Sequence, residues 1–106
     1  ITVPSYNSEA YLDRCMATLL PGGDEVEILI VDDGSKDRTA EIADEYERKY
    51  PGIVRAIHQE NGGHGEAVNA GIRNATGLFR YILYRRRSKS LRKRRYYKIY
   101  QKLTWR

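Results

Sequence analysis

Short apolar runs alternate with amphipathic stretches along the first 84 residues of the chain. The runs are rich in β-branched side chains, and the stretches between them repeat apolar residues at helical spacing. This alternation is typical of βαβ units, in which helices cover the faces of a mainly parallel sheet. We therefore predict an α/β, Rossmann-like fold of about four mainly parallel strands and three helices.

The boundaries of these elements follow from the same pattern. Strands are expected at residues 1–4, 28–31, 53–58 and 78–84, and helices are expected between 8 and 20, between 38 and 50, and over 66–74. Residues 28–31 are apolar without a break, as in a central parallel strand covered on both faces. Asn7 or Ser8 is expected to cap the first helix. Its apolar face comprises Leu12, Cys15, Met16 and Leu19.

Charge divides the chain into two blocks. Residues 1–79 hold all 14 acids and 7 Lys or Arg, a net charge of −7, whereas residues 80–106 hold 12 Lys or Arg and no acid. Such asymmetry suggests different partners for the two parts. We expect a domain over 1–84 and a basic tail over 85–106. The tail is either disordered or helical over 89–105, with Tyr96, Ile99, Tyr100 and Leu103 on one face.

Composition excludes several classes of protein. No apolar run approaches the roughly 20 residues that span a bilayer, so no membrane helix is expected. The single cysteine, Cys15, suits a reducing compartment and a structural role as a small buried hydrophobe. Two histidines and one cysteine offer no transition-metal set.

Three polar loops follow the first three expected strands. In an open parallel sheet, the carboxyl ends of the strands share one edge, and ligands bind there. The loops offer an aromatic ring for a base, carboxylates for base or ribose donors, and glycines whose N–H groups suit phosphate. The candidate nucleotide-binding residues are Pro4, Tyr6, Asn7, Glu9, Asp32, Asp33, Gly62, Gly63, His64 and Asn69.

Each loop also has an ordinary structural explanation. Asp-Asp-Gly and Asn-Gly-Gly are common turns, because Asp tolerates tight turns and Gly adopts positive φ. Tyr6 alone is more often a packing residue, and His64 alone is more often a helix cap or a surface residue. Their common position at one end of the inferred sheet favours a nucleotide pocket over three unrelated turns.

The ordered set of motifs resembles family 2 glycosyltransferases. It consists of Pro-Ser-Tyr-Asn at 4–7 with Glu9, the run at 27–39 around Asp-Asp-Gly-Ser, Asn-Gly-Gly at 61–63, Asn-Ala-Gly at 69–71 and Ala-Thr-Gly at 75–77. The resemblance covers about residues 1–79. It implies a GT-A fold that binds a nucleoside diphosphate sugar, most commonly a UDP-sugar, usually through Mg²⁺ or Mn²⁺.

The resemblance also assigns roles to individual residues. It implies that Tyr6 stacks near the base, that Glu9 and Asp33 hold base or ribose, and that Asp32 is a supporting residue. The segment 62–69 would line the nucleotide pocket. The family suggests a role in cell-envelope polysaccharide synthesis and a cytoplasmic location, including a peripheral one at the inner membrane face.

The sequence departs from the family at the fourth strand. The family's Asp-x-Asp metal motif is expected there, but residues 78–87 contain arginines and no acid. Arginine cannot ligate a divalent cation. No cofactor can be assigned to this chain, no catalytic residue is identified, and the acceptor half of the enzyme is missing. The chain alone is therefore expected to be inactive.

Three explanations fit the basic tail. A truncated or frame-shifted gene is favoured, because the change in composition falls at the family's most constrained strand. A divergent protein in which Arg86 and Arg87 hold the diphosphate without metal is the second, since guanidinium groups bind phosphate well. A fused binding segment is the third.

Two other functions agree with parts of the sequence. A dinucleotide-binding enzyme shares the fold class, but Gly63-x-Gly65 lacks the third glycine and follows the third strand instead of the first. The other rival is a nucleic-acid or anionic-membrane binder that acts through residues 85–106. Cations there would neutralise phosphates while tyrosines and Trp105 stack on bases or lie at a lipid interface.

Overall fold

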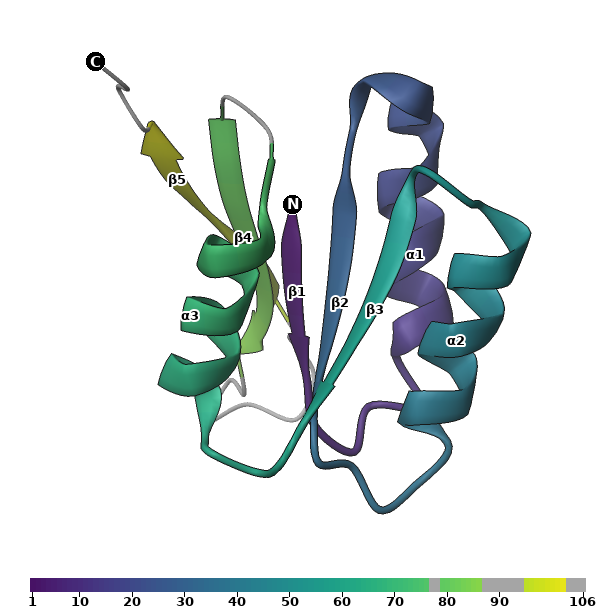
Figure 1. Ribbon diagram of the computed structural model, residues 1–106, viewed down its shortest axis with the longest axis vertical. Helices are drawn as coiled ribbons and strands as arrows, with labels where there is room; N and C mark the ends of the chain where they lie inside the picture. The colour runs from purple at the N-terminus through teal and green to yellow at the C-terminus, as the bar shows by residue number, and fades with distance from the viewer. Residues whose placement is uncertain (77–78, 87–94, 103–106) are drawn as a thin grey trace.

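The computed structural model describes residues 1–76, 79–86 and 95–102 of the chain. Five strands form one sheet in the order β3-β2-β1-β4-β5, and helices pack on both of its faces (Figure 1). The strands are β1 (Thr2–Ser5), β2 (Ile28–Asp33), β3 (Val54–Gln59), β4 (Phe79–Arg86) and β5 (Arg95–Lys102); the helices are α1 (Leu12–Leu19), α2 (Thr39–Lys49) and α3 (His64–Asn74), with a 3-10 helix η1 (Leu20–Glu25) after α1.

Three parallel strands carry the loops singled out in the sequence. β1 pairs with β2, which places Val3 opposite Ile30, and β2 pairs with β3, which places Ile30 opposite Ala56. β1 also pairs in parallel with β4 through Thr2 and Ile82. The predicted α/β fold with parallel strands and three helices is confirmed. Each of the four predicted strands ends one or two residues later than expected.

The core has two parts, one on each face of the sheet. α1 and α2 cover one face, where they bury Val3 and Ile30, and α3 covers the other, where Ala67 and Ala70 pack with Val31 (Figure 1). Covering both faces explains why the run in β2 is apolar throughout. The predicted apolar face of the first helix is confirmed, since its four members are buried: Leu12, Cys15, Met16 and Leu19.

The start of α1 differs from the prediction. The helix begins at Leu12 and has no side-chain cap, so neither Asn7 nor Ser8 caps it. Ser8 instead closes a turn, because its carbonyl oxygen accepts the N–H groups of Tyr11 and Leu12 at 2.9 Å. Its Oγ donates to the carbonyl of Tyr6 at 3.1 Å. The loop after β1 is therefore longer than the sequence suggested, and its groups are free to contact the next loop.

Gly71 sets the distance between α3 and the sheet. A Cβ atom on Gly71 would overlap the side chain of Thr2 in β1. Only glycine therefore allows this helix to lie so close to the strand. The close approach of α3 fixes the position of its first turn, which follows the glycine-rich loop after β3.

The tail contains a strand where one expectation was a helix. β5 pairs antiparallel with β4, with Ile82 opposite Ile99 and Tyr84 opposite Tyr97. The physical reason is that tyrosine-rich segments favour strands, and pairing with β4 supplies the backbone hydrogen bonds that a short isolated helix would have to form at a nucleation cost. The rest of the expectation for the tail falls on residues 87–94 and 103–106, outside the described residues.

No helix in the described ranges combines the length and the apolar character needed to cross a bilayer.

Candidate functional site

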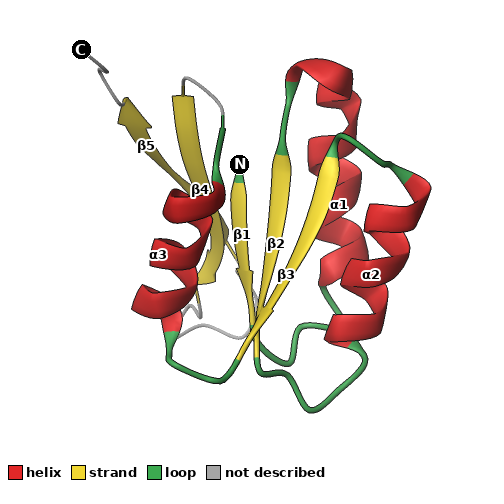
Figure 2. Ribbon diagram, viewed as in Figure 1, coloured by secondary structure: helices red, strands yellow, loops and turns green. Residues whose placement is uncertain are grey.

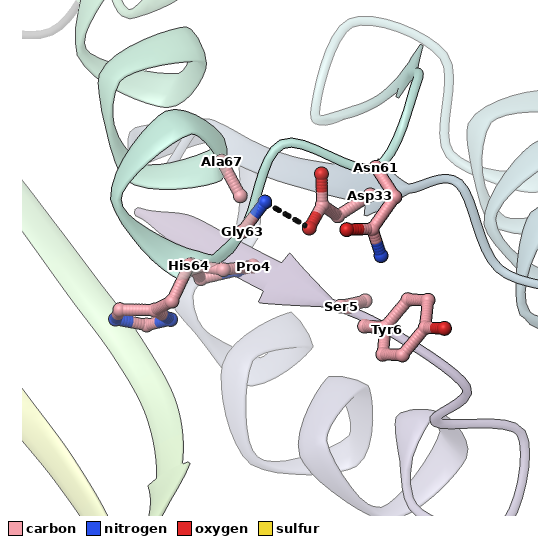
Figure 3. Close-up of a pocket in the computed structure, with 8 residues that line it drawn as sticks. All are labelled: Pro4, Ser5, Tyr6, Asp33, Asn61, Gly63, His64 and Ala67. Atoms are coloured by element: carbon pink, nitrogen blue, oxygen red, sulfur yellow. Dashed lines mark hydrogen bonds between the residues drawn. The ribbon is translucent and has the colours of Figure 1, made fainter.

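The loops after β1, β2 and β3 meet at one edge of the sheet, as their parallel pairing requires (Figure 2). They form a pocket of about 320 Å³, and Figure 3 shows its lining. The lining residues are Pro4, Ser5, Tyr6, Asp33, Asn61, Gly63, His64 and Ala67. The prediction that the three loops lie close together at one edge of the sheet is therefore confirmed.

Asp33 anchors the loop after β3 to the end of β2. Its side chain is only 4% exposed. Oδ1 accepts hydrogen bonds from the Gln59 side-chain amide and from the backbone N–H of Gly62, both at 2.8 Å. Oδ2 accepts the backbone N–H of Gly63 at 3.0 Å (Figure 3). One buried carboxylate thus orders the glycine-rich turn that leads into α3.

The environment of Asp33 keeps it ionised. Burial alone would raise its pKa, but the hydrogen bonds from Gln59, Gly62 and Gly63, together with the nearby His64, hold the pKa below its usual value. An ionised carboxylate only accepts hydrogen bonds. Asp33 therefore presents the pocket with an acceptor for a ligand N–H or O–H group.

The glycine N–H groups do not serve the purpose expected from the sequence. The N–H groups of Gly62 and Gly63 are directed at Asp33. They are thus engaged within the protein and are not offered to a phosphate. The glycines allow the turn to wrap around the carboxylate.

Tyr6 is the most exposed aromatic residue at the pocket. It is 47% exposed, although it follows directly on the buried Ser5 at the end of β1. A large ring left partly in water at the mouth of a pocket is available to stack on a planar ligand. Figure 3 shows Tyr6 among the same lining residues as Asp33 and Asn61.

Asn7 joins the loop after β1 to the loop after β2. Its φ of 47° is left-handed, a conformation that asparagine adopts more readily than most residues. Its N–H donates to Ser35 Oγ at 3.0 Å, and its Oδ1 accepts the N–H of Lys36 at 2.8 Å. Asn7 does not line the pocket. It fixes the backbone that carries Tyr6.

Glu9 makes a second link between the same two loops. Its N–H donates to Asp37 Oδ2 at 3.2 Å, and its Oε2 accepts the N–H of Arg38 at 3.2 Å. Asp37 also accepts the N–H of Thr39 at 2.9 Å, which satisfies a donor at the start of α2. Glu9 lies outside the pocket lining, and its carboxylate is directed at the neighbouring loop.

Asp32 faces away from the pocket into a separate network. It is 4% exposed and does not line the pocket. Oδ1 accepts the N–H of Ser35, and Oδ2 lies 3.0 Å from His58 Nδ1. His58 Nε2 lies 2.7 Å from Asp44 Oδ1 on α2. Hydrogen bonds to Asp32 and Asp44 raise the pKa of His58 above its usual value.

The remaining candidates divide in the same way. Pro4, Gly63 and His64 line the pocket, whereas Gly62 contributes through Asp33, and Asn69 is exposed on α3 outside the lining. The sequence places Ser5 and Asn61 in the converging loops and Ala67 in the segment 62–69 that the resemblance assigns to the pocket, whereas Gln59, the partner of Asp33, was not predicted. Gln59 is the last residue of β3, the strand next to β2. Its position opposite the end of β2 is the feature that could have indicated its contact with Asp33.

The described residues offer no cluster that could hold a divalent cation through protein ligands alone. No three His, Cys, Asp or Glu side chains gather closely enough to hold a metal ion within those residues. The Mg²⁺ or Mn²⁺ implied by the family resemblance therefore has no ligand set there. Arg86 is the last residue of β4, and Arg87 lies outside the described residues.

A pocket at the carboxyl ends of parallel strands is the usual ligand-binding position in open α/β proteins, and this chain is of that class. Residues 1–84 match the family model described as Glycosyl transferase family 2. The chain belongs to this family, as the motif resemblance predicted.

Three similar proteins place this result in context. The uncharacterized glycosyltransferase EpsJ of Bacillus subtilis (strain 168) is 41% identical over 80 residues, which are 74% of this chain and 23% of EpsJ. The minor teichoic acid biosynthesis protein GgaA of the same strain is 30% identical over 86 residues, covering 77% of this chain and 19% of GgaA. The crystal structure of S. aureus TarS 1-349 in complex with UDP-GlcNAc has a TM-score of 0.61 and 29% identity, covering 78% of this chain and 24% of that one.

The chain spans about a quarter or less of the length of these three proteins.

Proposed function

We propose that the pocket between Tyr6 and Asp33 binds the base and ribose of a nucleoside diphosphate sugar. The chain would then be the donor-binding part of a glycosyltransferase. The observation that carries this proposal is the joint placement of an exposed ring and a buried, ionised carboxylate in one pocket. The ring suits the face of a base, and the carboxylate suits an N–H on its edge or a ribose hydroxyl.

We propose uridine as the base. Uracil offers one ring N–H between two carbonyl oxygens, so its edge needs an acceptor flanked by donors. Asp33 is the acceptor, and the amide of Asn61 in the same lining supplies a donor. The likeness to TarS, whose structure was solved with UDP-GlcNAc, supports this choice.

For the whole protein we propose transfer of the sugar to an acceptor in cell-envelope polysaccharide synthesis, at the cytoplasmic side of the membrane. Support comes from family membership and from the likeness to a teichoic acid biosynthesis protein. No residue of this chain is assigned as the catalytic base. Donor binding is therefore the part of the activity that this chain can be used to test.

The test is calorimetric titration of the 106-residue chain with UDP-GlcNAc and, for comparison, with GDP-mannose, which carries a different base. Replacing Tyr6 with Ala should weaken binding about 5- to 150-fold, because base stacking on an aromatic ring contributes about 1–3 kcal/mol. The matched control, Tyr6→Phe, keeps the ring and should bind within about twofold of the wild type. Equal affinity of the wild type and Tyr6→Ala would contradict the proposed role of Tyr6. If the wild type and both variants fail to bind, the proposed function is wrong.

Arg86 and Arg87 remain proposed diphosphate ligands. Binding of UDP-GlcNAc that persists in EDTA and is lost in an Arg86→Ala, Arg87→Ala double variant would support them. A strict requirement for a divalent cation would rule out the metal-free arrangement. Arg86 ends β4, which neighbours β1 in the sheet, and this placement supports the proposal for Arg86.

The charge of +12 over residues 80–106 favours a second candidate, binding of nucleic acid or an anionic membrane. Salt separates the two functions. Binding of RNA or anionic vesicles through the tail should fall steeply between about 50 and 200 mM salt, whereas stacked nucleotide-sugar binding should change less. Tight RNA binding without any nucleotide-sugar binding would favour the tail function alone.

A further inference from the structure

His58 lies between two carboxylates that come from different elements. Nδ1 is 3.0 Å from Asp32 Oδ2 at the end of β2, and Nε2 is 2.7 Å from Asp44 Oδ1 on α2. A neutral imidazole has one N–H, so it can donate to only one of two carboxylates. The imidazolium has two N–H groups and can donate to both. The geometry therefore matches the protonated form.

Asp32 extends this contact toward the pocket. Its other oxygen, Oδ1, accepts the N–H of Ser35 at 3.0 Å, and Ser35 Oγ accepts the N–H of Asn7 at 3.0 Å. Asn7 is next to Tyr6 in the chain and has left-handed backbone geometry that needs support. A continuous series of hydrogen bonds thus runs from Asp44 through His58, Asp32 and Ser35 to the backbone that carries Tyr6.

We propose that His58 is a positioning residue whose protonated ring holds the loops after β1 and β2 in the arrangement that the nucleotide requires. It acts through Asp32 and Ser35 and does not line the pocket. Nucleotide affinity should accordingly fall when His58 loses its proton. This inference rests on the proposed nucleotide-binding function.

The charges around His58 determine the direction of the effect. Within the part of the chain that the structure describes, the charged groups recorded as acting on it are Asp32 from β2 and Asp44 from α2, and both favour the imidazolium. The pKa of His58 is thus above its ordinary value of about 6.5. The interaction is complete at low pH and is lost as the pH rises through that raised pKa.

Deprotonation leaves one carboxylate facing a ring lone pair. If the remaining proton stays on the shorter Asp44 contact, Asp32 loses its partner and becomes free to reorient. Ser35 would then lose the fixed acceptor of its N–H, and Asn7, which donates to Ser35 Oγ, would be held less firmly. Replacing Asp44 with Asn removes one of the two carboxylates that require the imidazolium, so it should shift the pH dependence to lower pH.

The first measurement needs no nucleotide. In NMR spectra of the free 106-residue chain, the amide signals of Asn7 and Ser35 should titrate with the same midpoint as the His58 ring, above the ordinary imidazole value of about 6.5. The midpoint should fall in Asp44→Asn and stay unchanged in Glu47→Gln, which removes a carboxylate from an exposed position on the same helix. In His58→Gln the titration of both amides should disappear. The proposal is overturned if the amide signals of Asn7 and Ser35 do not titrate together with the His58 ring, or if they still titrate in His58→Gln.

The second measurement uses UDP-GlcNAc at pH values well below the pKa of the uracil ring N–H, so that neither the diphosphate nor the base loses a proton. Its dissociation constant should rise about three- to tenfold across the His58 titration, the size expected when one hydrogen bond that orders a site is lost. Because His64 also lines the pocket, the test is the difference between the two proteins: His58→Gln should lack the rise that the wild type shows. If UDP-GlcNAc binds with the same affinity at every pH, the positioning role is wrong while the proposed function stands. If UDP-GlcNAc binds at no pH, the proposed function fails and the amide titration alone decides whether His58 orders the loops.

Discussion

Gly34 passes so close to Asn61 that a Cβ atom on it would lie 2.7 Å from the Asn61 backbone nitrogen. This contact joins the loop after β2 to the loop after β3, next to the pocket. The φ of Gly34 is also left-handed, at +69°. Position 34 therefore needs glycine for two reasons: the backbone is left-handed there, and Asn61 leaves no space for a side chain.

Replacing Gly34 with Ala should destabilise the protein more than a matched change elsewhere. Gly52→Ala is the control, because Gly52 has a similar φ of +82° but nothing within 4 Å of the added Cβ. The control should cost about 1–2 kcal/mol for the left-handed conformation, and Gly34→Ala should cost about 1–3 kcal/mol more for overpacking. Urea unfolding of both variants measures the difference. Equal losses would mean that Asn61 moves aside freely.

A second matched pair lies within α3. Gly71→Ala should destabilise by about 1–3 kcal/mol, because the added methyl overlaps Thr2 and must push α3 from the sheet. Gly65→Ala, in the same helix with nothing within 4 Å of the new Cβ, should be neutral or stabilising by up to about 1 kcal/mol. Thermal unfolding tests both. A stabilised Gly71→Ala variant would show that the helix and the strand are not in contact.

Asp33→Asn should weaken both folding and nucleotide binding. Three N–H donors converge on this carboxylate, and an amide in any orientation directs its NH₂ group at one or more of them. The expected cost in unfolding free energy is about 1–3 kcal/mol, the usual penalty for a buried donor without a partner. Asp24→Asn removes the same charge from an exposed position and should change neither property. Urea unfolding and UDP-GlcNAc titration at pH 7 make the comparison.

Acid should destabilise the protein through Asp37 as well as Asp33. Burial opposes ionisation of Asp37, but hydrogen bonds from Thr39 and Glu9 outweigh it and lower the pKa. A carboxyl with a depressed folded-state pKa stabilises the protein above its unfolded pKa of about 3.9, and that stability is lost as the pH falls through the folded value.

The unfolding free energy should therefore decline from about pH 5 downward. Asp37→Asn should show a shallower decline, because one of the groups that take up protons on unfolding has been removed. Denaturant unfolding curves at a series of pH values provide the slopes. The same slope in the variant and the wild type would exclude Asp37 as a contributor.

Much of the fold could be predicted from the sequence because its pattern is strongly periodic. The buried face of α1 and the unbroken apolar run of β2 are local signals, and parallel pairing forces the loops that follow such strands to one edge. The meeting of Tyr6, Asp33 and Gly63 in one pocket could be expected on this basis.

The connections within the site could not be predicted, since they depend on register and on helix rotation. Gln59 reaches Asp33 because the two residues are opposite in the ladder between β2 and β3. His58 reaches Asp44 only because α2 turns that side chain toward β3. The loop residue Glu9 looked like a ligand group, but its carboxylate accepts the Arg38 N–H of the adjacent loop. Spacing along the chain carries none of this information.

All eight lining residues of the pocket fall between positions 4 and 67, within three consecutive strand–loop–helix units. One continuous stretch of the chain thus supplies every residue that lines this pocket. During synthesis, a ribosome has joined every lining residue to the chain before it makes β4. In evolution, recombination can therefore move all the residues that line this pocket together, as one continuous segment.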